Sequence, residues 1–178
     1  GAADFHVAVD LPARAQQRHR DGWAIGTPEP VANVFDSVVP ASRGPVGVRV
    51  YVPRAADTVL PLLAFFHGGG WVTCDLDSHD TMCRALARRA DCIVVSVDYP
   101  LAPEHPFPEG LDACWDVTTW LSRNGGDFGG DPLRLAVGGD SAGGNFAAVI
   151  ALRAREAHIA LSMQLLLYPI LDFRLDLP

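Results

Sequence analysis

The fold is decided by the stretch Leu133-Arg134-Leu135-Ala136-Val137-Gly138-Gly139-Asp140-Ser141-Ala142-Gly143-Gly144-Asn145. Its apolar part, Leu133–Val137, predicts a buried strand, and residues 145–157 after it predict a helix. A serine stands between the two, inside the spacing Gly-x-Ser-x-Gly. The order strand, sharp turn, serine, helix is typical of a turn that lifts a nucleophilic serine out of a sheet.

The residue types around Ser141 suit that chemistry. A serine hydroxyl is a weak nucleophile and must be held exposed near a base. Gly139 and Gly143 flank it where a side chain would collide with neighbouring backbone. The start of the helix offers unpaired N–H groups, and that of Ala142 can point at a developing oxyanion. A plain helix N-cap is the alternative role for Ser141, but the strand and glycines around it favour the nucleophile.

A second glycine turn follows another apolar run. Pro61–Phe66 predicts a buried strand, and His67-Gly68-Gly69-Gly70-Trp71 comes directly after it. Backbone without side chains approaches a substrate closely, so Gly68–Gly70 can add N–H donors to the same oxyanion. His67 precedes the glycines, and we expect it to shape this loop instead of acting as the base. Trp71 either lines a substrate pocket or joins the core.

The remaining segments alternate between strands and helices, which predicts an α/β fold with a mostly parallel sheet and helices on both faces. Further strands are expected at Val31–Val39, Val46–Val52, Cys92–Val97 and Leu161–Tyr168, and the strand before His67 is expected to span Leu60–Phe66. Helices are expected at Ser78–Ala90 and from Leu111 to the Asn124-Gly125-Gly126 stop. Residues Pro100 to Pro108 are expected to form a proline-rich loop.

The chain resembles the hormone-sensitive-lipase family of α/β hydrolases over roughly residues 28 to 172. Four motifs in the family's order carry the resemblance: His67–Trp71, Asp98-Tyr99, Leu101-Ala102-Pro103-Glu104-His105-Pro106-Phe107-Pro108 and Gly139–Asn145. The resemblance implies a carboxylesterase that cleaves small acyl esters through a Ser–His–Asp triad. It assigns the nucleophile to Ser141 and the oxyanion donors to Gly69, Gly70 and Ala142. It also implies that residues 1–30 are an N-terminal cap segment, with a helix near Leu11 to Trp23, and that 31–178 are a partial hydrolase core.

The family places its triad acid and histidine well downstream of the serine. No histidine follows His158 here, and Asp172 is not the acid in the family pattern. Asp140 is expected to be a structural acceptor, because adjacent residues on a sharp turn point apart. We therefore expect a fragment of a longer hydrolase with little turnover of its own. The other readings are a small-molecule receptor, or an amidase or deacetylase, on the same scaffold.

Two positions depart from the family pattern. Pro100 stands where the family usually has arginine, and Cys74 stands where it commonly has glycine. A cysteine is strained if its position needs a positive φ. Neither position belongs to the expected supporting set, which is His67, Gly68, Gly139, Asp140 and Gly143.

Composition excludes several classes of partner. The 178 residues suit one domain, and a net charge of −7 argues against nucleic acid and against an anionic membrane surface. Four scattered cysteines indicate neither a zinc site nor a disulfide framework, which favours free thiols in the cytosol. No signal peptide, membrane span, cofactor or metal is expected, and His79 and His105 are expected to be structural.

The last expected strand raises a question of partners. If the sheet stops at Leu161–Tyr168, an apolar edge is left without a neighbour. We expect one of three outcomes: a partner chain carries the remaining strands, a second copy of the chain pairs with this edge, or the chain is part of a longer molecule.

Overall fold

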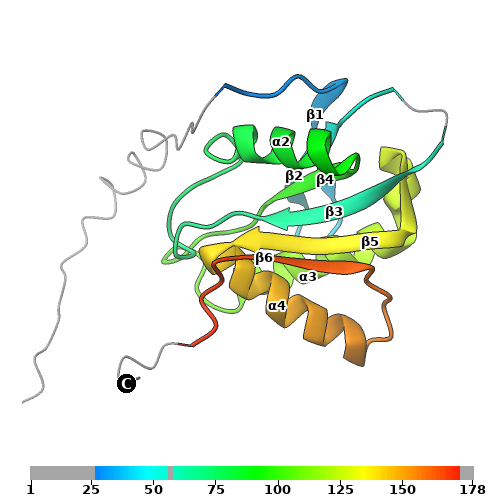
Figure 1. Cartoon of the computed structure of the whole chain (residues 1–178). Coiled ribbons are helices and arrows are strands. Elements are labelled where there is room, and N and C mark those ends of the chain that lie inside the picture. The colour runs from blue at the N-terminus through cyan, green and yellow to red at the C-terminus, as the bar shows by residue number, and fades with distance from the viewer. Residues whose placement is uncertain (1–26, 56–57, 173–178) are drawn as a thin grey trace, which may run out of the picture.

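The computed structural model describes residues 27–55 and 58–172 and forms a six-stranded sheet with helices on both faces (Figure 1). The strands are β1 (Asn33–Val39), β2 (Val46–Val52), β3 (Leu60–Phe66), β4 (Ile93–Asp98), β5 (Gly130–Asp140) and β6 (Met163–Leu167). The helices are α2 (Asp80–Ala90), α3 (Glu109–Asn124), the 3₁₀ turn η1 (Gly125–Phe128) and α4 (Ser141–Glu156). This is the predicted α/β class.

The strand order, β1-β2-β4-β3-β5-β6, brings the two glycine turns together. β1 and β2 pair antiparallel, as do β2 and β4, whereas β3 pairs parallel with β4 and β5, and β5 with β6. In the β3–β5 ladder Phe66 lies opposite Gly139. Because ligand sites in such sheets lie beyond the carboxyl ends of the strands, His67 and Ser141 both emerge at the edge where a site is expected.

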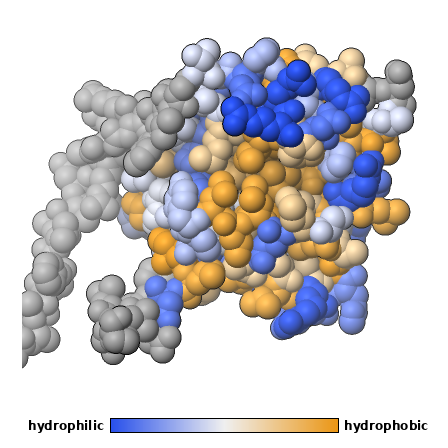
Figure 2. Space-filling model, viewed as in Figure 1, coloured by the Kyte–Doolittle hydropathy of each residue, from blue (hydrophilic) through white to orange (hydrophobic). Residues whose placement is uncertain are grey.

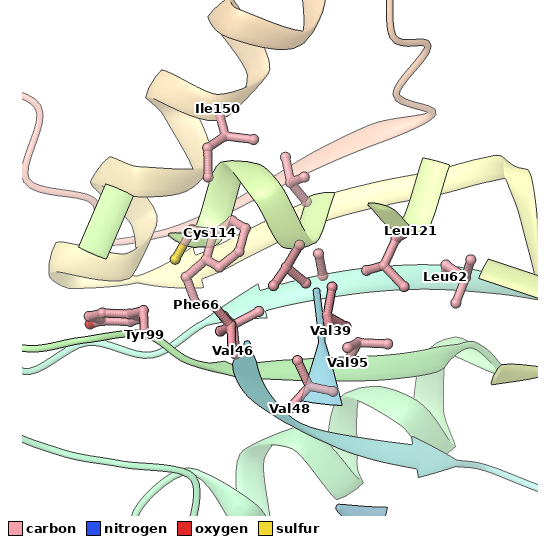
Figure 3. Packing of buried hydrophobic residues seen from close by; sticks show 14 of the residues in the cluster. Val39, Val46, Val48, Leu62, Phe66, Val95, Tyr99, Cys114, Leu121 and Ile150 are labelled. Carbon is pink, nitrogen blue, oxygen red and sulfur yellow. The ribbon is translucent and has the colours of Figure 1, made fainter. Parts of the chain in front are cut away.

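Two hydrophobic clusters hold the layers together. On one face, α3 and α4 cover the sheet with side chains that include Cys114, Leu121 and Ile150, packed on Leu62 and Phe66 (Figure 3). On the other face, α2 places Cys83 and Ala87 against Phe65 and its neighbours. The buried residues of α2 and α3 recur three or four positions apart, as Cys83 and Ala87 do in α2 and Cys114, Thr118 and Leu121 do in α3. The sheet edge where a site is expected thus rests on two packed cores.

Several element ends differ from the prediction. The helix expected from Ser78 begins at Asp80, and the one expected from Asn145 begins at Ser141 itself. The strand expected at Leu133–Val137 runs from Gly130 to Asp140, because both of its neighbours supply ladder partners beyond the apolar run.

The prediction that these strands are buried is also partly wrong. Leu133 is 83% exposed, and the expected strand Leu161–Tyr168 is Met163–Leu167. That last strand is only partly buried, because it forms the edge of the described sheet.

The predicted helix near Leu11 to Trp23 lies outside the described residues, so the cap segment 1–30 stays a prediction. All four cysteines lie inside them, buried and free, as the sequence indicated. Within residues 27–55 and 58–172 no helix has the length and apolar character that crossing a membrane requires.

Candidate active site

Ser141 stands at a strained junction. β5 ends at Asp140, α4 begins at Ser141, and the φ of Ser141 is +50°. A residue with a side chain adopts that left-handed conformation at a cost of about 1–3 kcal/mol, and such strain gathers at functional sites. The N-cap position belongs to Asp140, so Ser141 does not have the plain capping role.

The glycines around Ser141 make that junction possible. A Cβ on Gly139 would approach both the backbone of Gly143 and the Phe66 carbonyl oxygen far inside 3.0 Å. A Cβ on Gly143 would overlap that same oxygen. The first turn of α4 therefore lies directly against the end of β3, where only hydrogen side chains fit. The Ala142 side chain is fully buried, and its N–H lies in the first helical turn, where it has no intrahelical acceptor.

The glycine loop after β3 has the geometry of a donor loop. The φ values are +114° at Gly69 and +62° at Gly70. The Gly69 carbonyl accepts bonds from the Val72 and Thr73 N–H groups and from the Thr73 hydroxyl, at 3.0–3.1 Å. No hydrogen bond among the described residues uses the N–H of Gly69 or Gly70 as donor. The loop is thus held by its carbonyl, and those two N–H groups stay available.

Ser141 and this loop share a cavity of about 660 Å³. Its walls include Gly69, Gly70, Cys74, Asp140 and Tyr168. The predicted nucleophile and two of the three predicted oxyanion donors therefore meet in one place. Ala142 is not among the residues that line the cavity, so it can contribute to the site only through its backbone N–H.

Asp140 is the acceptor that ties the two turns together. Its Oδ1 accepts the Gly68 N–H at 2.9 Å, across 72 positions of sequence. A Cβ on Gly68 would overlap the carboxylate, which explains the glycine there. The Tyr168 hydroxyl donates to Oδ2 at 3.3 Å. Burial raises the pKa of Asp140, but these donors and His79 outweigh it, so the pKa lies below its ordinary value.

His67 is buried behind the loop and does not line the Ser141 cavity. Its Nδ1 lies 2.7 Å from the Gly68 carbonyl oxygen, and its ring stacks on Tyr99 with centroids 4.3 Å apart. The Tyr99 hydroxyl donates to the His67 carbonyl oxygen at 2.6 Å. Burial lowers the pKa of His67 to about 4, so it is neutral at pH 7. These contacts suit the predicted loop-shaping role and not that of a base.

The site also uses a residue that sequence reasoning missed. His79, at the start of α2, lies 8% exposed in the wall of the cavity, with Nε2 3.2 Å from Asp140 Oδ1. Its Nδ1 lies 3.0 Å from the Ser78 hydroxyl. The sequence placed His79 at a helix start, but no local pattern indicates a contact with a residue on β5.

None of the described histidines is placed to act as a base for Ser141. Both ring nitrogens of His79 are engaged, and His105 pairs with Glu109 in an exposed loop. His158 follows the far end of α4, about 24 Å along a 16-residue helix. Asp172 is exposed beyond β6. Among the described residues no group of three metal-ligating side chains clusters either.

Trp71 and Cys74 take distinct places around the loop. Trp71 lines a second, mostly apolar cavity of about 650 Å³ and packs near Phe146, with ring centroids 6.1 Å apart. It thus serves both a pocket and the rim of the core. Cys74 has φ +69° and lines the Ser141 cavity, so the strain expected of a cysteine at this position is present. Pro100 lies beside Trp71 in the wall of the second cavity.

A doubly covered sheet with a serine on a strained turn at the carboxyl end of an inner parallel strand defines an α/β hydrolase. A family model described as the alpha/beta hydrolase fold matches residues 63–178. The chain belongs to this family, in its hormone-sensitive-lipase branch.

Individual relatives agree with this family assignment. Esterase LipI of Mycobacterium tuberculosis is 44% identical over 94% of this chain and 53% of its own length. Carboxylesterase NlhH of the same species is 50% identical over 75% of this chain and 42% of its own. The solved structure of the carboxylesterase EstE1, from a metagenomic library, superposes with a TM-score of 0.88 at 36% identity, over 96% of this chain and 58% of that one. The chain therefore spans about half the length of the curated relatives it matches.

Proposed function

We propose that the protein hydrolyses carboxylic esters of small acyl groups, with Ser141 as the nucleophile. The observation that carries the proposal is the shared cavity: Ser141, held at φ +50°, lines the same space as Gly69 and Gly70, whose N–H groups donate to no described residue. The relatives named esterase and carboxylesterase support it.

The proposed reaction is acyl transfer in two steps. The Ser141 hydroxyl oxygen attacks the ester carbonyl carbon and gives its proton to a base. The N–H groups of Gly69, Gly70 and Ala142 hold the oxyanion, each worth roughly 3–4 kcal/mol in the transition state. The C–O bond to the alcohol then breaks and the alcohol takes the proton. Water attacks the acyl-serine in the second step, releases the acid and restores Ser141.

We further propose that the histidine base and its carboxylate come from outside this chain. Two observations support this. The described histidines are buried, engaged or remote from Ser141, and the chain spans about half the length of its relatives. Without the base, only the oxyanion donors and binding contribute, a loss on the order of 10⁴–10⁶ in kcat.

The test compares purified chain 1–178 with any longer product of the same reading frame, on p-nitrophenyl acetate and butyrate, each with and without Ser141→Ala. We expect slow turnover from 1–178 and fast, Ser141-dependent turnover once a downstream histidine is present. Chain 1–178 working within tenfold of a typical esterase, and losing this with Ser141→Ala, would place a base inside the chain. Ligand binding with no Ser141-dependent turnover from the longer product would instead identify a receptor.

A further inference from the structure

His79 differs from the other described histidines in how its ring is held. It occupies the N-cap position of α2 but makes no side-chain capping bond to that helix. Its ring turns instead to Asp140 at the end of β5, which faces Nε2, and to the hydroxyl of the preceding Ser78, which faces Nδ1. The exposed fractions of the His79 and Asp140 side chains are 8% and 7%, so water does little to screen the contact.

The hydrogen-bond partners of Ser78 decide whether the Nδ1 atom of His79 carries a hydrogen. The Ser78 hydroxyl oxygen lies 2.8 Å from the Asp75 carbonyl oxygen, and two oxygens that close must share a proton. A hydroxyl has one hydrogen, so Ser78 donates it to Asp75. Its lone pairs then accept the Asp75 N–H, at 2.9 Å, and His79 Nδ1 at 3.0 Å. Nδ1 must therefore bear a hydrogen.

The other ring nitrogen faces a carboxylate. Asp140 Oδ1 is an acceptor when ionised, so Nε2 also donates. A histidine that donates from both nitrogens is an imidazolium cation. The lowered pKa of Asp140 is consistent with a cation beside it.

We propose that His79 is a positively charged positioning residue, whose ion pair with Asp140 fixes the Gly68 amide and so holds the oxyanion loop against the Ser141 elbow. Asp140 Oδ1 accepts from both His79 and Gly68, so the histidine and the loop share one oxygen. The catalytic consequence of this inference rests on the proposed function, whereas the charge and the geometry do not.

Other titratable groups surround His79. Asp140 is the last residue of β5, Asp75 lies in the turn before α2, and the His67 ring centroid is 5.5 Å away, just after β3. Cys74 and Tyr168 share the cavity wall. Burial keeps His67 neutral at pH 7, so the charged groups facing the His79 ring are carboxylates.

The first test reads His79 directly, by ¹⁵N NMR of the histidine rings, assigned with His79→Gln. We expect both ring nitrogens of His79 to be protonated at pH 7, and the Gly68 amide resonance to shift at the pH where His79 titrates. In Asp140→Asn, we expect His79 to be neutral at pH 7. A neutral His79 in the unmodified protein would overturn the proposal. A Gly68 amide resonance that does not shift when His79 loses its proton would also overturn it.

The second test measures hydrogen exchange at the Gly68 amide. His79→Gln should speed exchange at least tenfold, whereas His105→Gln, which breaks the exposed His105–Glu109 pair, should leave it unchanged. Equal exchange in both variants would contradict the positioning role. If His79→Gln does not fold, the titration of the unmodified protein decides alone.

Neither readout requires turnover, so a protein without esterase activity still tests His79. Where an active form is in hand, His79→Gln should lower kcat at least tenfold with little change in KM, because oxyanion donors act on the transition state. Full kcat in His79→Gln would refute the positioning role and leave the proposed function intact.

Discussion

Gly143, on the first turn of α4, lies directly against the carbonyl oxygen of Phe66 at the end of β3, with no room for a Cβ between them. The contact joins the helix that carries Ser141 to the strand that leads into the glycine loop. A side chain at Gly143 would push the elbow and the loop apart. The close approach is therefore a condition of the shared cavity.

We predict that Gly143→Ala lowers the free energy of unfolding by about 3 kcal/mol or more, the upper end of overpacking, because the atom it meets is backbone. Gly126→Ala is the matched control, since a Cβ there meets nothing within 4 Å. Its expected effect is within about 1 kcal/mol. Urea unfolding of both variants measures the difference, and similar midpoints would mean that the elbow yields easily.

The stability of the protein should fall in mild acid because of His67. Its pKa is about 4 in the folded protein against an ordinary 6.5, as burial disfavours the cation. The unfolded chain then binds a proton that the native state refuses. Stability is therefore full above pH 6.5 and falls as the pH drops from 6.5 toward 4, by about 3 kcal/mol at most.

This window separates His67 from Asp140. The lowered pKa of Asp140 also favours the fold, but that contribution is present above its unfolded value of 3.8 and is lost only below it. Urea unfolding at pH 7 and pH 5 should show a smaller decrease in His67→Gln than in the unmodified protein. An equal decrease in the two proteins would assign the acid sensitivity to other groups.

The sequence predicted some elements well because apolar runs and turn residues mark them on both sides. Leu60–Phe66 and Val46–Val52 are strands with the predicted ends. β5 is longer than predicted because its ends are set by backbone pairing with β3 and β6, which apolar patterning does not encode. The length of a strand is thus partly a property of its neighbours.

The candidate site likewise has one part that the sequence predicts and one part that it does not. Ser141, Gly69 and Gly70 are identifiable because local backbone geometry demands small residues in a fixed spacing. The contact of His79 with Asp140 is long-range and involves two common residue types. No periodicity or motif marks it, so only the fold shows that the charge of Asp140 is partnered.

Cys74 tests how much strain the loop carries. At φ +69° a side chain costs about 1–2 kcal/mol. In Cys74→Gly the relief of strain is offset by chain entropy and lost packing, so we expect a change under about 1 kcal/mol. Cys74→Val should cost about 2 kcal/mol or more, because a β-branched side chain is worse still at positive φ.

Cys92 is the matched control for that substitution, since it is also buried but does not have a positive φ. Cys92→Val should cost less than about 1.5 kcal/mol, as for similar-sized apolar exchanges. Thermal unfolding monitored by circular dichroism compares the variants. Equal costs at the two cysteines would show that backbone strain at position 74 is unimportant.

The edge strand β6 leads to a prediction about assembly. Among the described residues β6 pairs only with β5, and Met163 on it is 53% exposed. Residues 163, 165 and 167 share the face of the sheet that carries α2, and Leu165 packs against the cluster beneath that helix. Apolar residues gather in the middle of this side of the molecule, below α2 and over β6 (Figure 2).

We expect the chain to self-associate through this edge, because an open apolar strand is a template for pairing and a large apolar patch favours contact. Met163→Lys should shift sedimentation velocity toward the monomer, since a charge on an edge strand opposes pairing. Leu152→Lys is the control, because Leu152 on α4 is 52% exposed and therefore similar in accessibility. A chain that sediments as a monomer at every concentration would show that β6 is covered in another way. Equal shifts in both variants would point to a general effect of charge and not to the edge.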